Sequence, residues 1–408
     1  MGVFRNENAA ALLFRDTRQQ GKCSTRSPHI RIRSRRYTLM STTAYAPASL
    51  SSKGTAQCQA STNPPALPQL VPPNFDAQLA YVLGLCCNAA NDQYTKYVTN
   101  TPLDPSNRFG PKSWQIQSVA PTPWDPDFSQ IVAQGYKPNP THTNLSVYET
   151  DINGNSVKIP AGFIARLEPT DTDKSSIIVV SFHGTQNSYE VNTVDNYIVP
   201  AVFGNLGSVH GGFYNQYTTG STGQGDLSHR ADGSLAQQIS QYFDDNEDPT
   251  LSVKVTGHSL GGALATLCAL DIALNLESKF DAISMYSLAS PRVADTLVVI
   301  PAAAETFVSN YQEYVPDSYR IVNQLDSIPQ LPYPVTPPIP PLNYCAHVLG
   351  DLDAILFGIV KPSLLDLNVI SFQDKNDQNT DSPPACQGAH SCPAVYVPFL
   401  KRLAAQFA

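Results

Sequence analysis

The sequence predicts an α/β fold in which helices cover both faces of a mostly parallel sheet. Short, largely apolar segments that are typical of buried strands alternate along the chain with longer segments whose apolar residues recur at helical spacing. The chain can also bury a large core, because 42% of its 408 residues are hydrophobic and only 15% are charged. This composition excludes a charge-driven disordered protein.

The expected elements follow one another from residue 74 to the C-terminus. An Asn-Phe-Asp sequence at residues 74–76 precedes the first run with helical periodicity, so we expect the ordered body to begin there. Strands are expected at 177–182, 251–255, 283–288 and 319–322. Helices are expected from 76 to about 86, at 235–243, at 261–276 and from about 394 onward.

The first 73 residues differ in composition from this body. Residues 1–40 hold nine basic and two acidic residues and form a basic leader. Three interpretations stay open: an unstructured segment upstream of a second start at Met40, an organelle transit peptide, and a twin-arginine signal at Arg35-Arg36. Residues 41–73, with six prolines and Lys53 as the one charged residue, are interpreted as a linker. Residues 74–408 then form one domain, and the localisation stays open.

Charge and cysteine content restrict the partners. Residues 41–408 hold 17 basic and 32 acidic residues, a balance of −15, so nucleic acid is not expected as a partner. No apolar run approaches the ~20 residues that span a bilayer, so stable membrane insertion is not expected. Eight cysteines show no zinc-ligand spacing, and we expect no metal or other cofactor. Cys386 and Cys392 could form a local disulfide or remain free thiols. The oligomeric state is not indicated.

The segment with the clearest chemistry follows the strand expected at 251–255. Residues 257–261 read G-H-S-L-G, and the expected helix comes directly after them. In this strand–turn–helix context the residues two before and two after the serine must be small, so that the backbones can pass each other. The serine then lies at a helix N-terminus, which favours a developing negative charge. Ser259 is therefore the expected nucleophile, and a structural tight turn is the alternative.

An acyl-transfer serine needs donors for the oxyanion. The N–H of Leu260, directly after the serine, is one expected donor. The second is expected from Thr185, which follows the strand at 177–182 and can offer both its N–H and its hydroxyl. Gly184 before it permits a close backbone approach. The alternative for this loop is an ordinary strand-ending turn.

Five ordered motifs make the sequence similar to the class 3 lipases, over roughly residues 76–405. They are F-H-G-T at 182–185, V-H-G-G-F at 209–213, the serine motif at 257–265, A-S-P-R-V at 289–293, and the segment 320–329 with R-I-V-N and D-S-I-P. His183 stands where the family usually has Arg, and Ala289 where it has Gly. The resemblance implies an α/β-hydrolase fold and the hydrolysis of carboxylic esters.

The remaining triad residues are expected in the order acid, then base. Asp326 follows an apolar strand and precedes a stiff Ile-Pro turn, and the resemblance points to the same residue; Asp351 and Asp353 compete by order alone. His390 lies in a loop of small residues before the C-terminal helix, and the resemblance makes it the general base. His347 is similar to a structural histidine of these lipases and is the alternative base.

These residues predict a serine-triad lipase that hydrolyses long-chain acylglycerols through an acyl-enzyme. Its partner would be a neutral lipid or ester at a lipid–water interface. The resemblance implies a mobile lid at 188–203, with a permanently packed segment as the alternative. The proline-rich segment 329–341 is either a second wall of the site or a rigid spacer. A phospholipase A1 or galactolipase with the same triad, or a non-catalytic lipase-like binding module, are the alternative functions.

Overall fold

The computed structural model describes residues 67–68, 71–72, 74–103, 114–171, 174–197, 200–296, 301–326, 328–331, 344–346, 369–372 and 387–408. By its internal contacts the chain divides into Met1–Thr55 and Ala56–Ala408, and all described residues belong to the second unit. The basic leader and most of the expected linker therefore lie outside the described residues. Leu67 and Val71, near the end of that linker, pack against the hydrophobic core.

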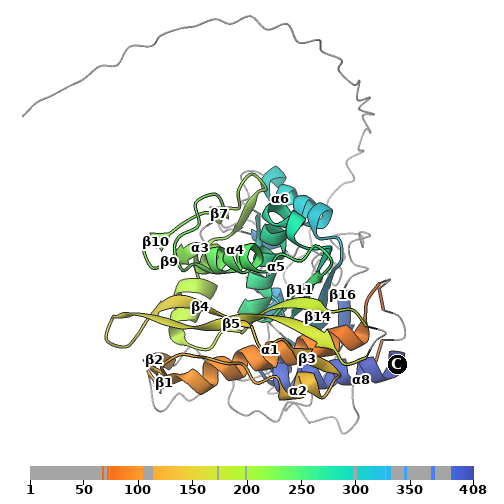
Figure 1. Ribbon diagram of the computed structural model, residues 1–408. Helices are drawn as coiled ribbons and strands as arrows, with labels where there is room; N and C mark the ends of the chain where they lie inside the picture. The colour runs from red at the N-terminus through yellow and green to blue at the C-terminus, as the bar shows by residue number, and fades with distance from the viewer. Residues whose placement is uncertain are drawn as a thin grey trace, which may run out of the picture. The chain divides into compact units, whose positions relative to one another are not determined.

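An eight-stranded sheet runs through the domain and confirms the predicted α/β class (Figure 1). Its order is β16 (Val369–Phe372), β14 (Ser318–Asn323), β12 (Ala282–Leu288), β11 (Ser252–His258), β6 (Ile177–Phe182), β5 (Ser156–Pro169) and β3 (Tyr136–Pro138), with β4 (Thr143–Thr150) also paired to β5. The strands from β16 to β6 are parallel to their neighbours. β5 is antiparallel to β6, β3 and β4. The sheet is thus mostly parallel, as predicted.

Helices lie on both faces of this sheet (Figure 1). On one face are α1 (Ala77–Tyr97), α2 (Ser129–Val132) and α8 (Val397–Phe407); on the other are α3 (Gly211–Thr218), α4 (Leu235–Asp245), α5 (Leu260–Asn275) and α6 (Pro301–Tyr314). Each face has its own hydrophobic core. α5 is buried on all sides from its first residue to Ala273, which agrees with its almost entirely apolar sequence. α4 and α8 each bury a single face.

Short elements complete the domain. A four-stranded sheet has the order β15 (Tyr344–Ala346), β13 (Ala294–Thr296), β8 (Ser208–His210) and β7 (Pro200–Val202), and its pairs are antiparallel. Two further pairs are β1 (Val98–Pro102) with β2 (Trp114–Val119), and β9 (Thr219–Gly220) with β10 (Gly223–Gln224). Short helical turns are η2 (Glu190–Asp195), η3 (Glu277–Lys279), η4 (Ile328–Gln330), η6 (Gln387–His390) and η7 (Cys392–Tyr396).

The sequence pattern did not indicate the long antiparallel pair β4–β5. Pro160 and Gly162 lie inside β5, and both residue types argue against a strand interior. The structure places them where the register shifts between Leu145 and Ser146 of β4, so the strand bends at these residues. The local sequence therefore indicated a turn at Pro160 and Gly162, whereas pairing with β4 makes this segment a bulged strand. The strand expected at 177–182 coincides with β6.

Four cysteines are buried free thiols, namely Cys86, Cys87, Cys268 and Cys392. Cys86 and Cys87 are buried in α1, where they pack in the core. Cys392 is also free and buried, whereas Cys386 lies outside the described residues. Of the two alternatives for Cys392, the structure therefore has the free thiol.

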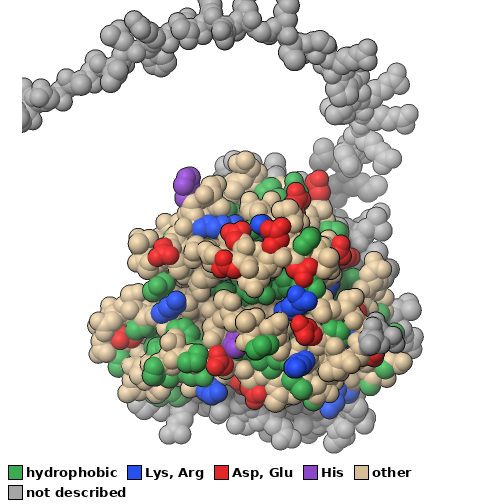
Figure 2. Space-filling view, viewed as in Figure 1, with side chains coloured by type: hydrophobic (Ala, Val, Ile, Leu, Met, Phe, Trp, Pro, Cys, Tyr) green, Lys and Arg blue, Asp and Glu red, His purple; other side chains and the backbone are tan. Residues whose placement is uncertain are grey.

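Three findings bear on the expected partners. None of the helices that the structure describes is long and apolar enough to cross a bilayer. The described residues contain no group of three or more His, Cys, Asp or Glu side chains that could hold a metal ion. On the face shown in Figure 2, Lys and Arg side chains are interspersed with Asp and Glu rather than gathered in one basic patch.

Gly162→Ala should destabilise the fold, because a Cβ at this position would lie 1.9 Å from the backbone oxygen of Ser181 in β6. With φ at +149° the backbone is also unfavourable for alanine. We expect the free energy of unfolding in urea to fall by about 3 kcal/mol or more. Gly154→Ala is the control, since its φ is +81° but no atom lies within 4 Å of the new Cβ, and it should cost about 1 kcal/mol. Equal losses in the two variants would contradict this account.

Candidate active site

Ser259 occupies a strained turn between β11 and α5. Its φ is +58° and its ψ −127°, a conformation that residues other than glycine rarely adopt. A Cβ on Gly257 would lie 2.0 Å from the oxygen of Gly261, and one on Gly261 would lie 2.3 Å from the oxygen of His183. The two glycines therefore allow the crossing backbones that the sequence motif predicted, and the Ser259 N–H donates to Leu288 O at 2.9 Å.

Ser259 is also the N-cap residue of α5. Leu260 is the first residue of this helix, and the N–H groups of a first helical turn have no intrahelical acceptor. The amide of Gly262 already bonds back to Ser259 O at 2.8 Å. The Leu260 N–H thus stands beside the serine at the positive end of the helix dipole, where an anion is stabilised.

The structure brings Ser259, His390 and Asp326 into one hydrogen-bonded series. His390 Nε2 lies 2.8 Å from Ser259 Oγ, and His390 Nδ1 lies 2.7 Å from Asp326 Oδ2. The Asp326 carboxylate is buried, while the His390 side chain is 25% exposed. A carboxylate, an imidazole and a hydroxyl in this order can activate the hydroxyl as a nucleophile.

Asp326 is held by two donors besides His390. Tyr396 OH donates to Asp326 Oδ2 at 2.8 Å, and the Ile328 N–H donates to Oδ1 at 2.9 Å. Burial and then the neighbouring carboxylate raise the pKa of Tyr396 well above its usual range, so the phenol remains a donor. Tyr396 OH in turn accepts from the backbone N–H of Asn323 at 3.0 Å. The sequence analysis did not single out Tyr396, and an aromatic residue in an apolar helix carries no signal of this role.

Two further contacts hold the segment that carries His390. Asn323 Nδ2 donates to Ala389 O at 3.0 Å, and His258 Nε2 lies 2.7 Å from His390 O. Burial and then His390 lower the pKa of His258 well below its usual range, so the ring is neutral and Nε2–H can donate to this carbonyl. His258, the residue before Ser259, thus also helps to position the segment that carries His390.

The loop after β6 approaches the serine closely. A Cβ on Gly184 would lie 3.0 Å from Ser259 Cβ. The Gly184 N–H donates to Asn91 Oδ1 of α1 at 3.1 Å, and Gln186 Nε2 donates to the same oxygen at 3.0 Å. The Thr185 hydroxyl donates to Asp195 Oδ2 at 2.9 Å. Residues 184–186 are called the oxyanion loop below, and Asn91 and Asp195 are its anchors.

The segment expected to be a lid is described except for residues 198–199. Its inner part forms η2, in which the side chains of Glu190, Val191 and Val194 are buried. A Cβ on Gly212 of α3 would lie 1.9 Å from Val194 O, so the two backbones touch. By contrast, Tyr197 is 43% and Val202 65% exposed. In this structure η2 packs on the body while two apolar side chains of the segment face outward.

Other candidates from the sequence are either structural or not described. His210 is buried and stacks on Phe213 with ring centroids 4.0 Å apart, so it packs in the core. Burial lowers its pKa to about 4. His347, Asp351 and Asp353 lie outside the described residues, as do residues 332–341 of the proline-rich segment.

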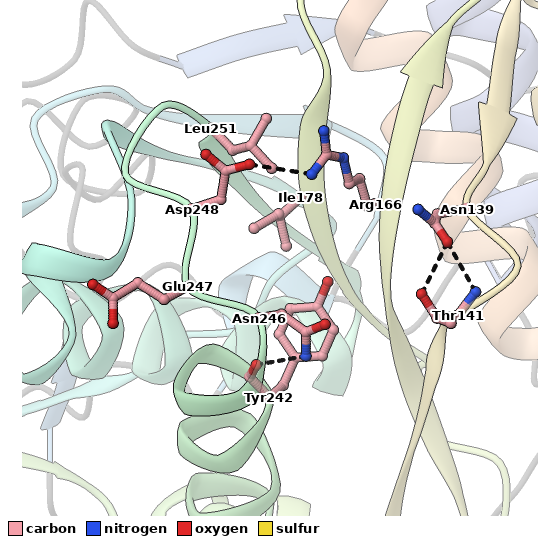
Figure 3. A pocket seen from close by; sticks show the side chains of 9 residues that line it. All are labelled: Asn139, Thr141, Arg166, Ile178, Tyr242, Asn246, Glu247, Asp248 and Leu251. Carbon is pink, nitrogen blue, oxygen red and sulfur yellow. Dashed lines mark hydrogen bonds and ion pairs between the residues drawn. The ribbon is translucent and has the colours of Figure 1, made fainter.

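A polar hollow lies at the other end of β11 (Figure 3). Leu251, which immediately precedes β11, lines it, whereas Ser259 follows the last residue of that strand. Arg166 of β5 reaches across it to Asp248, with Nη1 3.1 Å from Oδ2. The hollow is therefore separated from the triad by the length of the strand.

Comparison with known proteins gives one family match. Residues 179–336 match the family model for lipase (class 3). A lipase of Rhizomucor miehei is 36% identical over 125 residues, which are 30% of this chain and 28% of the relative. Phospholipase A1-II 1 of Oryza sativa subsp. indica is 32% identical over 184 residues, 42% of this chain and 44% of the relative. The matches thus span less than half the length of these relatives.

Solved structures of lipases are also similar to the chain. The Lip2 lipase of Yarrowia lipolytica has a TM-score of 0.37 and 18% identity, covering 69% of this chain and 88% of that one. The native propeptide complex of the Rhizomucor miehei lipase has a TM-score of 0.34 and 22% identity. It covers 63% of this chain and 63% of that one.

Tyr396→Phe should slow the reaction of Ser259 with an active-site phosphonate. The variant removes one of the donors that fix Asp326, and a lost buried hydrogen bond of about 1–2 kcal/mol corresponds to a rate reduced about 5- to 30-fold. Tyr311→Phe is the control, because its buried hydroxyl bonds to Ser318 at 3.0 Å. The control should lose similar stability and keep the labelling rate. Equal labelling rates in both variants would show that Tyr396 does not act through Asp326.

Proposed function

We propose that the chain is a hydrolase of the class 3 lipase family and that it cleaves the ester bonds of long-chain acylglycerols with Ser259 as the nucleophile. The observation that supports this proposal is the series from Ser259 Oγ through His390 to Asp326, with distances of 2.8 and 2.7 Å. A hydroxyl activated in this way attacks carboxylic esters.

In the proposed acylation step, Ser259 Oγ attacks the ester carbonyl carbon while its proton passes to His390 Nε2. Asp326 Oδ2 accepts the Nδ1–H of His390 and stabilises the imidazolium that forms. When the tetrahedral intermediate collapses, the bond to the leaving alcohol breaks and His390 Nε2 protonates its oxygen. A water molecule, deprotonated by His390, then releases the fatty acid and restores Ser259.

The developing oxyanion is proposed to bind the backbone N–H groups of Leu260 and Thr185. Leu260 stands at the N-terminus of α5, and Gly184 brings the Thr185 backbone close to the serine. The Thr185 hydroxyl is engaged with Asp195 Oδ2 and would have to turn away from it to become a third donor. In the ground state the Asp195 contact keeps this side chain in one rotamer.

Charge and surface support a neutral lipid substrate. The balance of −15 over residues 41–408 disfavours binding to anionic bilayers. Tyr197 and Val202, both partly exposed, belong to the segment that follows the oxyanion loop, and exposed apolar side chains suit contact with a lipid surface.

The second candidate is a phospholipase A1 or galactolipase. It is favoured by the match to the rice phospholipase A1-II 1, which covers a larger share of this chain than the match to the Rhizomucor miehei lipase. The same triad would serve these substrates, so only the head-group preference differs. A non-catalytic binding module is disfavoured, because the three side chains already have the spacing that proton transfer needs.

Ser259→Ala should abolish hydrolysis of a short soluble ester such as p-nitrophenyl butyrate. Removal of a triad nucleophile lowers kcat by about 1,000-fold or more, because the reaction cannot proceed through the acyl-enzyme. Ser252→Ala, at the other end of β11, should keep the wild-type rate. Retention of most activity by Ser259→Ala would refute the mechanism. Failure of the wild type to form a phosphonate adduct on Ser259 would favour a binding module.

A panel of lipids should identify the substrate class. We expect emulsified trioleoylglycerol to be hydrolysed at least about 10-fold faster than phosphatidylcholine or a galactolipid, since the exposed apolar side chains of Tyr197 and Val202 suit a substrate without a polar head group. Each rate is measured by titration of released fatty acid, with Ser259→Ala as the blank. A higher rate on phosphatidylcholine or galactolipid would support the second candidate instead.

A further inference from the structure

Two glutamates lie buried behind the oxyanion loop, outside the triad. Glu149 comes from β4 and Glu190 from η2, and both side chains are inaccessible to solvent. They contact residues of the same loop region, which connects β6 to η2. Buried carboxyl groups are costly unless they are paired with a cation or hold a proton, so this pair requires an explanation.

The contacts connect both carboxyl groups to the backbone beside Thr185. Glu190 Oε2 accepts the backbone N–H of Gln186 at 2.5 Å. Asn187 Nδ2 donates to Glu149 Oε2 at 2.8 Å, and Asn187 Oδ1 accepts the N–H of Glu190 at 3.1 Å. Gln216 Nε2 of α3 donates to Glu149 Oε1 at 3.3 Å. The first two residues after Thr185 are thus held by the glutamate pair.

The pair needs a proton because no described cation neutralises it. His183 Nε2 lies 3.8 Å from Glu190 Oε1, but it lies closer to Pro160 O, at 2.9 Å, and burial lowers the pKa of the ring. Glu190 Oε1 accepts no N–H or O–H from the described residues. Both carboxyl groups are buried and both glutamates contact Asn187, so a negative charge on one disfavours a negative charge on the other, and Glu190 holds a proton.

We propose that Glu190, buried beside Glu149, is a positioning residue for the oxyanion loop, and that loss of its proton at alkaline pH releases the loop. The proposal rests on the proposed function, in which this loop supplies the Thr185 donor. η2 holds the loop at two points, with Glu190 at its first residue bound to Gln186 and Asp195 at its last bound to Thr185.

The groups that face the pair favour the neutral form of Glu190. Burial raises the pKa of Glu190 to about 8, and Asp195 of the same turn contributes in the same direction. Burial and the neighbouring Glu190 raise the pKa of Glu149 well above its usual range. Tyr94 of α1 and Tyr189, the residue before η2, face the same carboxyl groups, and burial raises the pKa of both phenols, so they stay neutral. His183 completes this set and is also neutral.

The sign of the pH effect follows from this shift. An unfolded chain releases the proton of a glutamate near pH 4.5, whereas the folded chain keeps it until about pH 8. Between these values the native state binds more protons than the unfolded state, so stability falls as pH rises. Above about pH 8 Glu190 carries a negative charge in a buried site beside Glu149, and this charge acts directly on the backbone of the loop.

The test compares Glu190→Gln and Glu190→Ala with the wild type between pH 6 and 10 on p-nitrophenyl butyrate. Glutamine has the shape of the protonated acid and cannot ionise, so kcat at pH 7 should stay within about 3-fold. At pH 9 its kcat should exceed that of the wild type by about 5-fold or more. Alanine should lower kcat at pH 7 by about 10-fold or more with KM within about 3-fold, since a lost oxyanion donor acts on the transition state.

The matched control is Glu277→Gln, which makes the same chemical change at an exposed glutamate of η3. It should superimpose on the wild-type pH profile. The proposal would be overturned if Glu190→Gln kept the wild-type alkaline decline, or if Glu190→Ala kept the wild-type kcat.

A second readout does not depend on catalysis. The Tm of the wild type should fall from pH 6 to pH 8.5 by more than that of Glu190→Gln, with Glu277→Gln parallel to the wild type. If the glutamine variant does not fold, amide hydrogen exchange of the wild type provides the test. After correction for intrinsic exchange rates, the protection of Gln186 and η2 should fall above pH 8, whereas β11 should stay protected. Unchanged protection would refute the proposal. These measurements hold even if Ser259→Ala disproves the esterase.

Discussion

The crossing of two backbones at the serine turn is the constraint on which the site depends. Gly257 lies so close to Gly261 that a Cβ on the first would lie 2.0 Å from the oxygen of the second. This approach holds Ser259 at a φ of +58°, and the conformational strain is offset by the burial of α5 from its first residue to Ala273. β11 lies inside the eight-stranded sheet and α5 is buried, so the serine is presented by two central elements of the core.

Around Ser259, the residues Asp326, His390 and Gly184 are held by side chains that belong to different elements. Tyr396 and Asn323 connect Asp326 to the segment before His390, so the acid and the base are positioned by the same small network. Asn91 of α1 fixes Gly184 of the oxyanion loop. Such a site is preorganised by contacts between elements, which is how donors and acceptors can be placed before the substrate arrives.

Much of the fold and the residues of the triad could be predicted from the sequence. The alternation of apolar runs predicted β6, β11, β12 and β14, because buried parallel strands need nearly continuous apolar residues. β5 escaped prediction, since Pro160 and Gly162 resemble a turn until β4 pairs with them at a bulge. A local sequence pattern shows which backbone conformation a segment favours by itself. It does not show which neighbouring strand will pair with that segment and change its conformation.

The sequence by itself determined the proposed nucleophile Ser259, its small neighbours and the order of the proposed acid and base, because each depends on residues adjacent in the chain or on a fixed order. Only the tertiary structure decided the groups that position them. Asn91 and Gly184 are 93 residues apart, and Tyr396 and Asp326 are 70 apart. Glu149 and Glu190 come from separate elements, and each alone is an ordinary glutamate. Their roles arise from burial and mutual contact, which depend on how the chain folds and not on any local pattern.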